Sequence, residues 1–172
     1  TVAVVDASSD DSFDPLADQT VSVTTADNDV AGFTVVESGG STSVNESGTT
    51  DTFTVVLNAQ PDSGTNVVLS ITSSDTGEAT VNSPLTFTSS NWNTPQTVTV
   101  TGVDDNLLDG TQTSTFTISV VDANSADQFD SVADQTVSGT TVDNDSAGFT
   151  VTEISGTSVS ESGTTDTFTV VL

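Results

Sequence analysis

The sequence of 172 residues contains no lysine, arginine or histidine, whereas aspartate and glutamate together number 25. Without basic side chains the protein cannot neutralise phosphates, which excludes nucleic acid as a partner and disfavours an anionic membrane surface. Neighbouring carboxylates also have no counter-charge within the chain, and two of them ~4 Å apart repel by about 4 kcal/mol at an effective dielectric constant of about 20. Clustered carboxylates in this chain therefore need cations from the medium.

Cysteine, methionine and tyrosine are also absent, and there is a single tryptophan. The lack of cysteine excludes disulfides as a source of stability. No stretch approaches the ~20 apolar residues of a membrane-spanning helix, so we expect no membrane insertion. Strong acidity without cysteine suits a salty, calcium-containing exterior, and we expect a secreted, extracellular or cell-surface protein.

The missing residue types leave few groups for catalysis. Only carboxylates and hydroxyls remain for acid–base or nucleophilic chemistry. A carboxylate pair of the glycosidase kind is chemically possible, but it would need a cleft, which nothing in the sequence indicates. The sequence therefore predicts that the protein is not an enzyme.

Apolar residues make up 33% of the chain, a low fraction that often accompanies disorder when charge is high. Here they are mostly β-branched and alternate with threonine and serine, as in antiparallel strands that have one face in water. The pattern predicts an all-β fold with strands at 32–36, 51–57, 66–72, 78–82, 84–88, 96–102, 113–121 and 134–142.

A period of two assigns the apolar residues of these strands to the core and the threonine and serine residues between them to water. The inward set is Phe53, Val55, Leu57, Val67, Leu69, Ile71, Val98, Val100, Phe116, Ile118 and Val120. We expect Trp92, which lies beside a turn, to cover one end of this core, although a sugar-stacking role is the alternative.

The chain repeats itself. The string Asp-Asn-Asp occurs at 27–29 and at 143–145, an offset of 143 − 27 = 116 residues, and the matches extend over 1–29 with 117–145 and 31–57 with 147–172. A unit of this length is too long for a helical solenoid repeat and suits a sandwich of seven or eight strands. We therefore expect the C-terminal part of one repeat at 1–29, a complete repeat at 30–145 and the N-terminal part of a third at 146–172. An excerpt from a longer array is favoured over strand exchange between chains.

Acidic residues of the complete repeat gather in four places: Glu46; Asp75 and Glu78; Asp104, Asp105 and Asp109; Asp143 and Asp145. In an antiparallel sandwich, successive loops alternate between the two ends. The strand at 113–121 runs away from the loop at 103–110 and the strand at 134–142 returns, so Asp143 and Asp145 should arrive at the end where Asp104 and Asp105 lie.

Oxygen ligands without nitrogen or sulfur select Ca²⁺ or Mg²⁺ over zinc or copper, and a flexible group of carboxylates favours Ca²⁺, which accepts six to eight oxygens. The alternative is that these aspartates only solubilise turns, where aspartate is common. The absence of basic partners favours calcium. A second acidic set, Asp122, Asp127, Asp130 and Asp134, has counterparts at Asp6, Asp11, Asp14 and Asp18; a solvated loop is favoured there over a second cation site.

Three motifs occur in a fixed order: Glu46-Ser47-Gly48 before a Thr/Val strand, Asp104-Asp105 opening a loop that ends in Asp109-Gly110, and the terminal Asp143-Asn144-Asp145. With the string NWNTPQTVTVTGVDD at 91–105, this order resembles the Calx-beta domain, the calcium-binding sandwich of sodium–calcium exchangers, and in particular the Calx-beta-like repeats of large secreted bacterial surface proteins.

The resemblance implies tandem immunoglobulin-like antiparallel β-sandwich repeats that bind calcium where modules join. Carried over by position, the ligands are Glu46, Asp104, Asp105, Asp143 and Asp145. Asp109 in the same loop is a further candidate, as are the repeat equivalents Asp27, Asp29 and Glu161 in the flanking parts. Gln112 stands where such domains often have a second glutamate.

These patterns predict an extracellular structural repeat that calcium rigidifies, part of an extended fibre, sheath or adhesin stalk. Its expected partners are neighbouring repeats of the same protein, with self-assembly into a fibre. The alternative is a surface module that binds carbohydrate or ice through a threonine-rich face that includes Thr97, Thr99 and Thr101.

Overall fold

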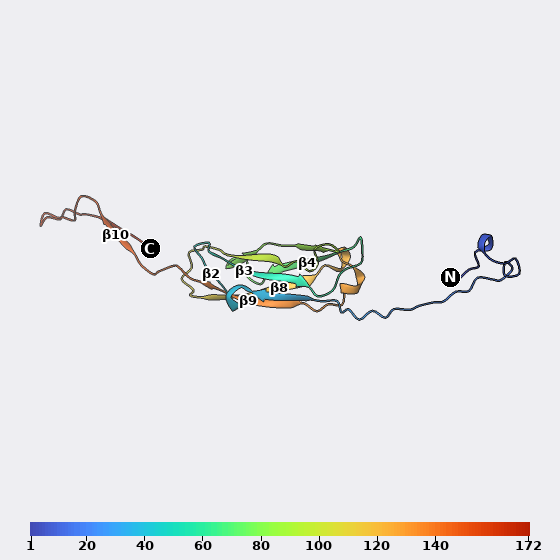
Figure 1. Cartoon of the computed structure of the whole chain (residues 1–172). Helices are drawn as coiled ribbons and strands as arrows, with labels where there is room; N and C mark the ends of the chain where they lie inside the picture. The colour runs from blue at the N-terminus through green and yellow to red at the C-terminus, as the bar shows by residue number, and fades with distance from the viewer.

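The computed structural model describes the whole chain, residues 1–172, and its regular structure is β with four single turns of 3₁₀-helix. A body of nine strands occupies the middle, and the two terminal segments leave it at opposite ends (Figure 1). The strands are β1 (Phe33–Glu37), β2 (Thr42–Asn45), β3 (Thr50–Leu57), β4 (Asn66–Ser73), β5 (Ala79–Val81), β6 (Leu85–Thr88), β7 (Gln96–Gly102), β8 (Gln112–Val120) and β9 (Gln135–Val142). No helix has the length and hydropathy of a membrane span.

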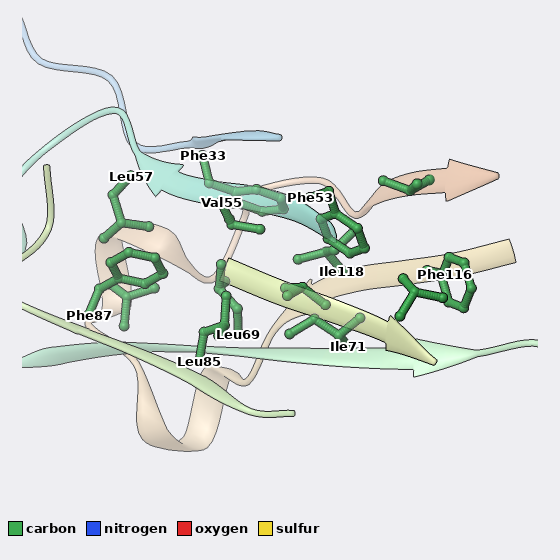
Figure 2. Close-up of a cluster of buried hydrophobic side chains, with 14 of the residues drawn as sticks. Phe33, Phe53, Val55, Leu57, Leu69, Ile71, Leu85, Phe87, Phe116 and Ile118 are labelled. Atoms are coloured by element: carbon green, nitrogen blue, oxygen red, sulfur yellow. The ribbon is translucent and has the colours of Figure 1, made fainter. Parts of the chain in front are cut away.

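The nine strands form two sheets. One has the order β1-β3-β7-β5 and is antiparallel throughout; the other has the order β2-β9-β8-β4-β6 and is antiparallel except for the parallel pair β2–β9. Both sheets contribute to a single cluster of 19 buried apolar residues, so the body is a β-sandwich. Figure 2 shows side chains of the two sheets, such as Phe53 and Leu69, directed into the space between the layers.

The alternation of apolar and polar residues sets the register of this core. Phe53, Leu69, Val98 and Phe116 are all 0% exposed, which confirms the inward phase predicted for their strands. Val120 is half-buried at the end of β8. Trp92 packs against the core, and its carbonyl accepts the Leu57 N–H at 3.1 Å, so it covers one end of the core as expected.

Two features differ from the sequence-based expectation. No strand was expected at β2, because Thr42–Asn45 is short and mostly polar; it forms after Gly39 and Gly40, both with positive φ, turn the chain from one sheet to the other. Three hydroxyl side chains that were not in the predicted inward set are buried, namely Thr42, Ser114 and Thr141. Each of these stands on the inward phase of its strand, and Thr42 and Thr141 donate hydrogen bonds there.

Pairing directions gather four loops at one end of the sandwich, which we call the joint end. Strands β2, β4, β7 and β9 finish there, so the loops at 46–49, 74–78, 103–111 and 143–145 lie together. The opposite, far end carries the loops at 58–65, 89–95 and 121–134, and the segment that precedes β1 also reaches it (Figure 1).

The flanking segments make few tertiary interactions. Residues 1–29 contain the 3₁₀ turn η1 (Asp6–Ser8) and one bridge between Val2 and Gln19. Residues 146–172 form a hairpin of β10 (Thr150–Glu153) and β11 (Phe168–Val171), in which every strand residue is exposed. Both sheets of the sandwich are thus complete within 33–142.

Candidate metal centre

Five carboxylates meet at the joint end. They form two groups, Glu46–Glu78–Asp109 and Glu46–Asp143–Asp145, and within each group one oxygen per residue lies within 4.8 Å of the others. Glu46 belongs to both groups and is 1% exposed. We call these five residues the joint cluster.

The fold holds Glu46 inside this end by backbone contacts on both sides. Its N–H donates to the carbonyl of Val142 at 3.2 Å, which continues the β2–β9 pairing by one residue. On the other side, β7 ends at Gly102, whose N–H donates to Thr49 at 3.0 Å. A methyl group at Gly102 would overlap the backbone carbonyl of Asn45, so only glycine permits this close approach.

Glu78 enters from the loop between β4 and β5. Its backbone carbonyl accepts the Val103 N–H at 2.8 Å and the Thr141 hydroxyl at 3.3 Å, which ties this loop to β7 and β9. The side chain is 7% exposed, and its Oε2 has no hydrogen-bond partner. A buried carboxylate oxygen without a donor is costly unless a cation or a proton reaches it.

Hydrogen bonds fasten the segment after β9 to the loop at 103–111. Asp143 accepts the Gly110 N–H at 2.7 Å and the Asp145 N–H at 2.6 Å. These bonds, first that from Asp145 and then that from Gly110, lower the pKa of Asp143. The Asn144 amide donates to Asp104 at 3.0 Å, and its backbone N–H donates to Glu46 at 3.1 Å. Asp145 Oδ2, by contrast, is buried without a partner.

Burial and mutual repulsion raise the pKa of three members of the joint cluster. For Glu78, burial is the main cause, followed by the charge of Asp109. For Asp145, burial again comes first, followed by the charges of nearby aspartates. For Glu46, the hydrogen bond from Asn144 lowers the pKa, but burial and neighbouring aspartates together outweigh it and raise the pKa overall. The cluster therefore resists carrying all of its charge when no cation is present.

The predicted ligands divide into three sets. Four lie in the joint cluster: Glu46, Asp109, Asp143 and Asp145. Two lie at its border, Asp104 and Asp105. Asp104 is exposed and accepts a hydrogen bond from the Asn144 side-chain amide. Asp105 accepts the Leu107 N–H at 2.7 Å, and its charge helps to raise the pKa of Glu46. Three lie elsewhere: Asp27 and Asp29 are at the far end, and Glu161 is exposed in the C-terminal hairpin.

The flanking candidates nevertheless reproduce the local geometry of their sequence equivalents in the sandwich. The Asp29 N–H donates to Asp27 at 2.9 Å, as the Asp145 N–H does to Asp143. The turn that carries Glu161 is closed by a hydrogen bond from Ser160 to Thr164 at 2.7 Å, which matches the one beside Glu46. The loops that would complete their clusters correspond to residues 58–116, which the sequence contains only once.

Glu78 was not among the predicted ligands, although the sequence places it in an acidic loop.

The second acidic set, at the far end, does not form a cluster like the one at the joint end. No three of its carboxylates come close enough to share an ion. Burial, and then the charges of Asp122 and Asp127, raise the pKa of Asp130.

Comparison with known proteins adds little to this geometry. No protein-family profile matches the sequence, and no curated protein sequence matches it. Among solved structures, SSP-19, an MSP-domain protein-like family member of Caenorhabditis elegans, is similar over 60% of this chain and 92% of its own, with 15% identity and a TM-score of 0.36. A likeness of that degree carries no argument about fold or function.

The calcium-free protein should become more stable on mild acidification. The pKa values of Glu46, Glu78 and Asp145 are raised in the folded chain, so the stability they contribute is present below the ordinary values of 4.5 and 3.8 and is lost as the pH rises through the raised values. We expect the melting temperature in calcium-free buffer to increase as the pH falls from neutrality toward those ordinary values. A cation bound by the same oxygens would displace the protons and reverse this trend.

Glu46→Gln is the matched variant for the pH measurement. On acidification its melting temperature should increase less than that of the wild-type chain, and Asp130 at the far end still contributes to this increase. A melting temperature of the wild-type chain that falls steadily over the same range in calcium-free buffer would contradict the raised pKa values.

Proposed function

We propose that the joint cluster binds calcium and that the protein is a structural repeat whose joint calcium stiffens. The observation that carries the proposal is the pair of carboxylate groups that share the buried Glu46 in a chain without a single cationic side chain. A buried glutamate is normally paired with a cation or neutralised by a proton. Here the cation must come from solution.

The donor set fits calcium. Ca²⁺ binds carboxylate oxygens at about 2.4 Å, so two oxygens on one ion are at most about 4.8 Å apart. The oxygens of each group fall within 4.8 Å of one another. Glu78 Oε2 and Asp145 Oδ2, one in each group, are buried and lack partners, which supports one ion in each group with Glu46 common to both. Bound calcium would supply the positive charge that no side chain of this protein supplies.

The position of the cluster supports a mechanical role. Asp143 and Asp145 belong to the segment that leaves the sandwich, whereas Glu46, Glu78 and Asp109 belong to its body. Ions shared between the two would fix the direction in which the chain leaves. In the proposed array of Calx-beta-like, immunoglobulin-like repeats of 116 residues, that direction sets the angle between neighbours.

We place this array outside the cell, where calcium is abundant, as part of a fibre, sheath or adhesin stalk whose partners are further repeats of the same protein. The role is structural and not enzymatic. Electrostatics supports the calcium dependence, because without cations the repulsion among the carboxylates opposes a fixed joint. Monovalent salt screens charges that lie more than roughly 8 Å apart and leaves most of the repulsion within the cluster in place.

Small-angle scattering of a two-repeat chain tests the proposal. Two copies of residues 30–145 joined directly recreate the natural sequence Asp-Asn-Asp-Val-Ala-Gly at the junction. We expect calcium to lengthen this chain and narrow its spread of interdomain angles, while circular dichroism shows little change in strand content, because each sandwich is already formed.

A second candidate function, binding to ice or carbohydrate, is favoured by the outer face of one sheet. Threonines pair across β3 and β7 at Thr50–Thr101, Thr52–Thr99 and Thr54–Thr97, a regular hydroxyl array larger than the single run expected. Ice-affinity and glycan-array assays test this candidate. Retention on either that is lost in a Thr52→Val, Thr99→Val variant would support it, and no retention of the wild-type chain would remove it.

A further inference from the structure

Two apolar side chains are exposed at the joint end, next to the joint cluster. Leu107 and Leu108 are 62% and 60% exposed at the tip of the loop between β7 and β8, flanked by Asp105 and Asp109. A hydrogen bond from Gly110 to Asp143 ties the loop to the segment after β9, and one from Leu107 to Asp105 closes a turn within the loop. Adjacent leucines held outward by a fixed loop form a defined apolar contact surface.

The far end carries a cleft of about 400 Å³. Its apolar lining consists of Val30, Ala31, Ala59, Phe129 and Val132, and its rim includes Asp27, Asp29 and Asp62. Phe129 forms a buried floor, whereas Val30 is 78% exposed. The sandwich thus exposes an apolar projection at one end and, at the other, a mixed cleft in which five of the eleven lining residues are apolar.

The internal repeat brings these two features together. Asp27 and Asp29, at the cleft, are the repeat equivalents of Asp143 and Asp145. Asp143 holds the leucine loop of its own repeat through Gly110. In an array, Asp143 of one repeat therefore accepts the Gly110 N–H of its own loop at 103–111 and also lines the cleft of the next repeat.

We propose that Leu107 and Leu108 of one repeat dock into the cleft of the repeat that follows it. The occupant is thus a second copy of this unit, joined head to tail. The docking rests on the proposed function in that it needs the array, and it adds an apolar contact to the calcium joint. The rim and the loop both carry carboxylates, so cations in the joint cluster would weaken the repulsion between them, and calcium and docking reinforce each other.

Chemical cross-linking in the two-repeat chain tests the docking, because the protein has no cysteine of its own. One cysteine replaces Leu108 in the first copy (Leu108→Cys), and the other replaces Ser131, an exposed residue lining the cleft, in the second copy (Ser131→Cys). The matched control pairs Leu108→Cys with Ser138→Cys, on the exposed face of β9. In calcium, a short bis-maleimide should join the first pair at least roughly tenfold faster than the control, since docking raises the effective concentration of the two thiols.

A second variant separates docking from calcium binding. Leu107→Ser together with Leu108→Ser should leave the calcium affinity of a single 30–145 repeat unchanged but widen the spread of interdomain angles of the two-repeat chain in scattering. Equal cross-linking of the two cysteine pairs in calcium overturns the docking and leaves the calcium joint standing. Fast, selective cross-linking in a chain that binds no calcium establishes the docking and overturns the calcium joint instead.

Discussion

Removing calcium should lower the melting temperature of residues 30–145 by many degrees. A ligand present at 100 times its dissociation constant stabilises the folded state by about 2.7 kcal/mol. For a domain of 116 residues, 1 kcal/mol shifts the melting temperature by about 4 °C, so each ion should contribute roughly 10 °C. Differential scanning calorimetry with calcium and with chelator at neutral pH measures this effect.

The Glu46→Gln variant should lose almost the whole calcium response. The substitution keeps the size of the side chain and removes the charge common to both carboxylate groups. In chelator it should melt no lower than the wild-type chain, because it removes a buried charge that has no cationic partner. Asp134→Asn, at an exposed carboxylate of the far end, is the matched control and should keep the full response. Identical melting curves of the wild-type chain with calcium and with chelator would refute calcium stabilisation.

The second large effect concerns the core. Phe116→Ala should cost about 3–5 kcal/mol of unfolding free energy, because Phe116 is fully buried between the sheets and its removal leaves a cavity. Thr115→Ala, one residue earlier on the exposed face of β8, should change the free energy by less than about 0.5 kcal/mol. Urea denaturation in saturating calcium gives both values. Similar losses for the two variants would mean that β8 is packed in the opposite phase.

Local pattern was sufficient to predict eight of the nine strands of the sandwich and the inward faces of β3, β4, β7 and β8. Apolar residues recur at every second position of β3, β4, β7 and β8, with Val56 and Val68 as the only apolar residues on the outward phase, so a shift by one residue would expose an entire apolar row. The same pattern gave no signal for β2, where Thr42–Asn45 has only one strongly apolar residue. That strand forms because Gly39 and Gly40 redirect the chain and β9 offers a parallel partner, and neither condition is visible in a short window of sequence.

Glu78 shows why the composition of the site was harder to predict than the strands. Counting strands as alternating in direction through 78–82 and 84–88 sends the loop at 103–110 to the end opposite Glu78. In the structure β5 and β6 run the same way in different sheets, since β5 pairs antiparallel with β7 and β6 with β4. The chain changes sheet between them without reversing. This crossing places Glu78 beside Asp109.

Antiparallel order predicts the positions of the last two strands correctly, because the chain makes no such crossing between them. It places the segment after β9 beside the loop at 103–110, where Gly110 donates its hydrogen bond to Asp143. The argument could not separate Asp109, inside the joint cluster, from Asp104, at its border, because loop conformation decides which carboxylates turn inward.

The most direct test of the account compares the two-repeat chain with its Asp143→Asn, Asp145→Asn variant in small-angle scattering. The wild-type chain should lengthen and narrow its angular spread as calcium is added. The variant should keep the same broad spread at every calcium concentration while both sandwiches stay folded, because Asp143 and Asp145 are the joint-cluster members in the segment that leaves the sandwich. If the wild-type chain shows one spread of interdomain angles with and without calcium, the joint is a passive tether and the proposed function is wrong.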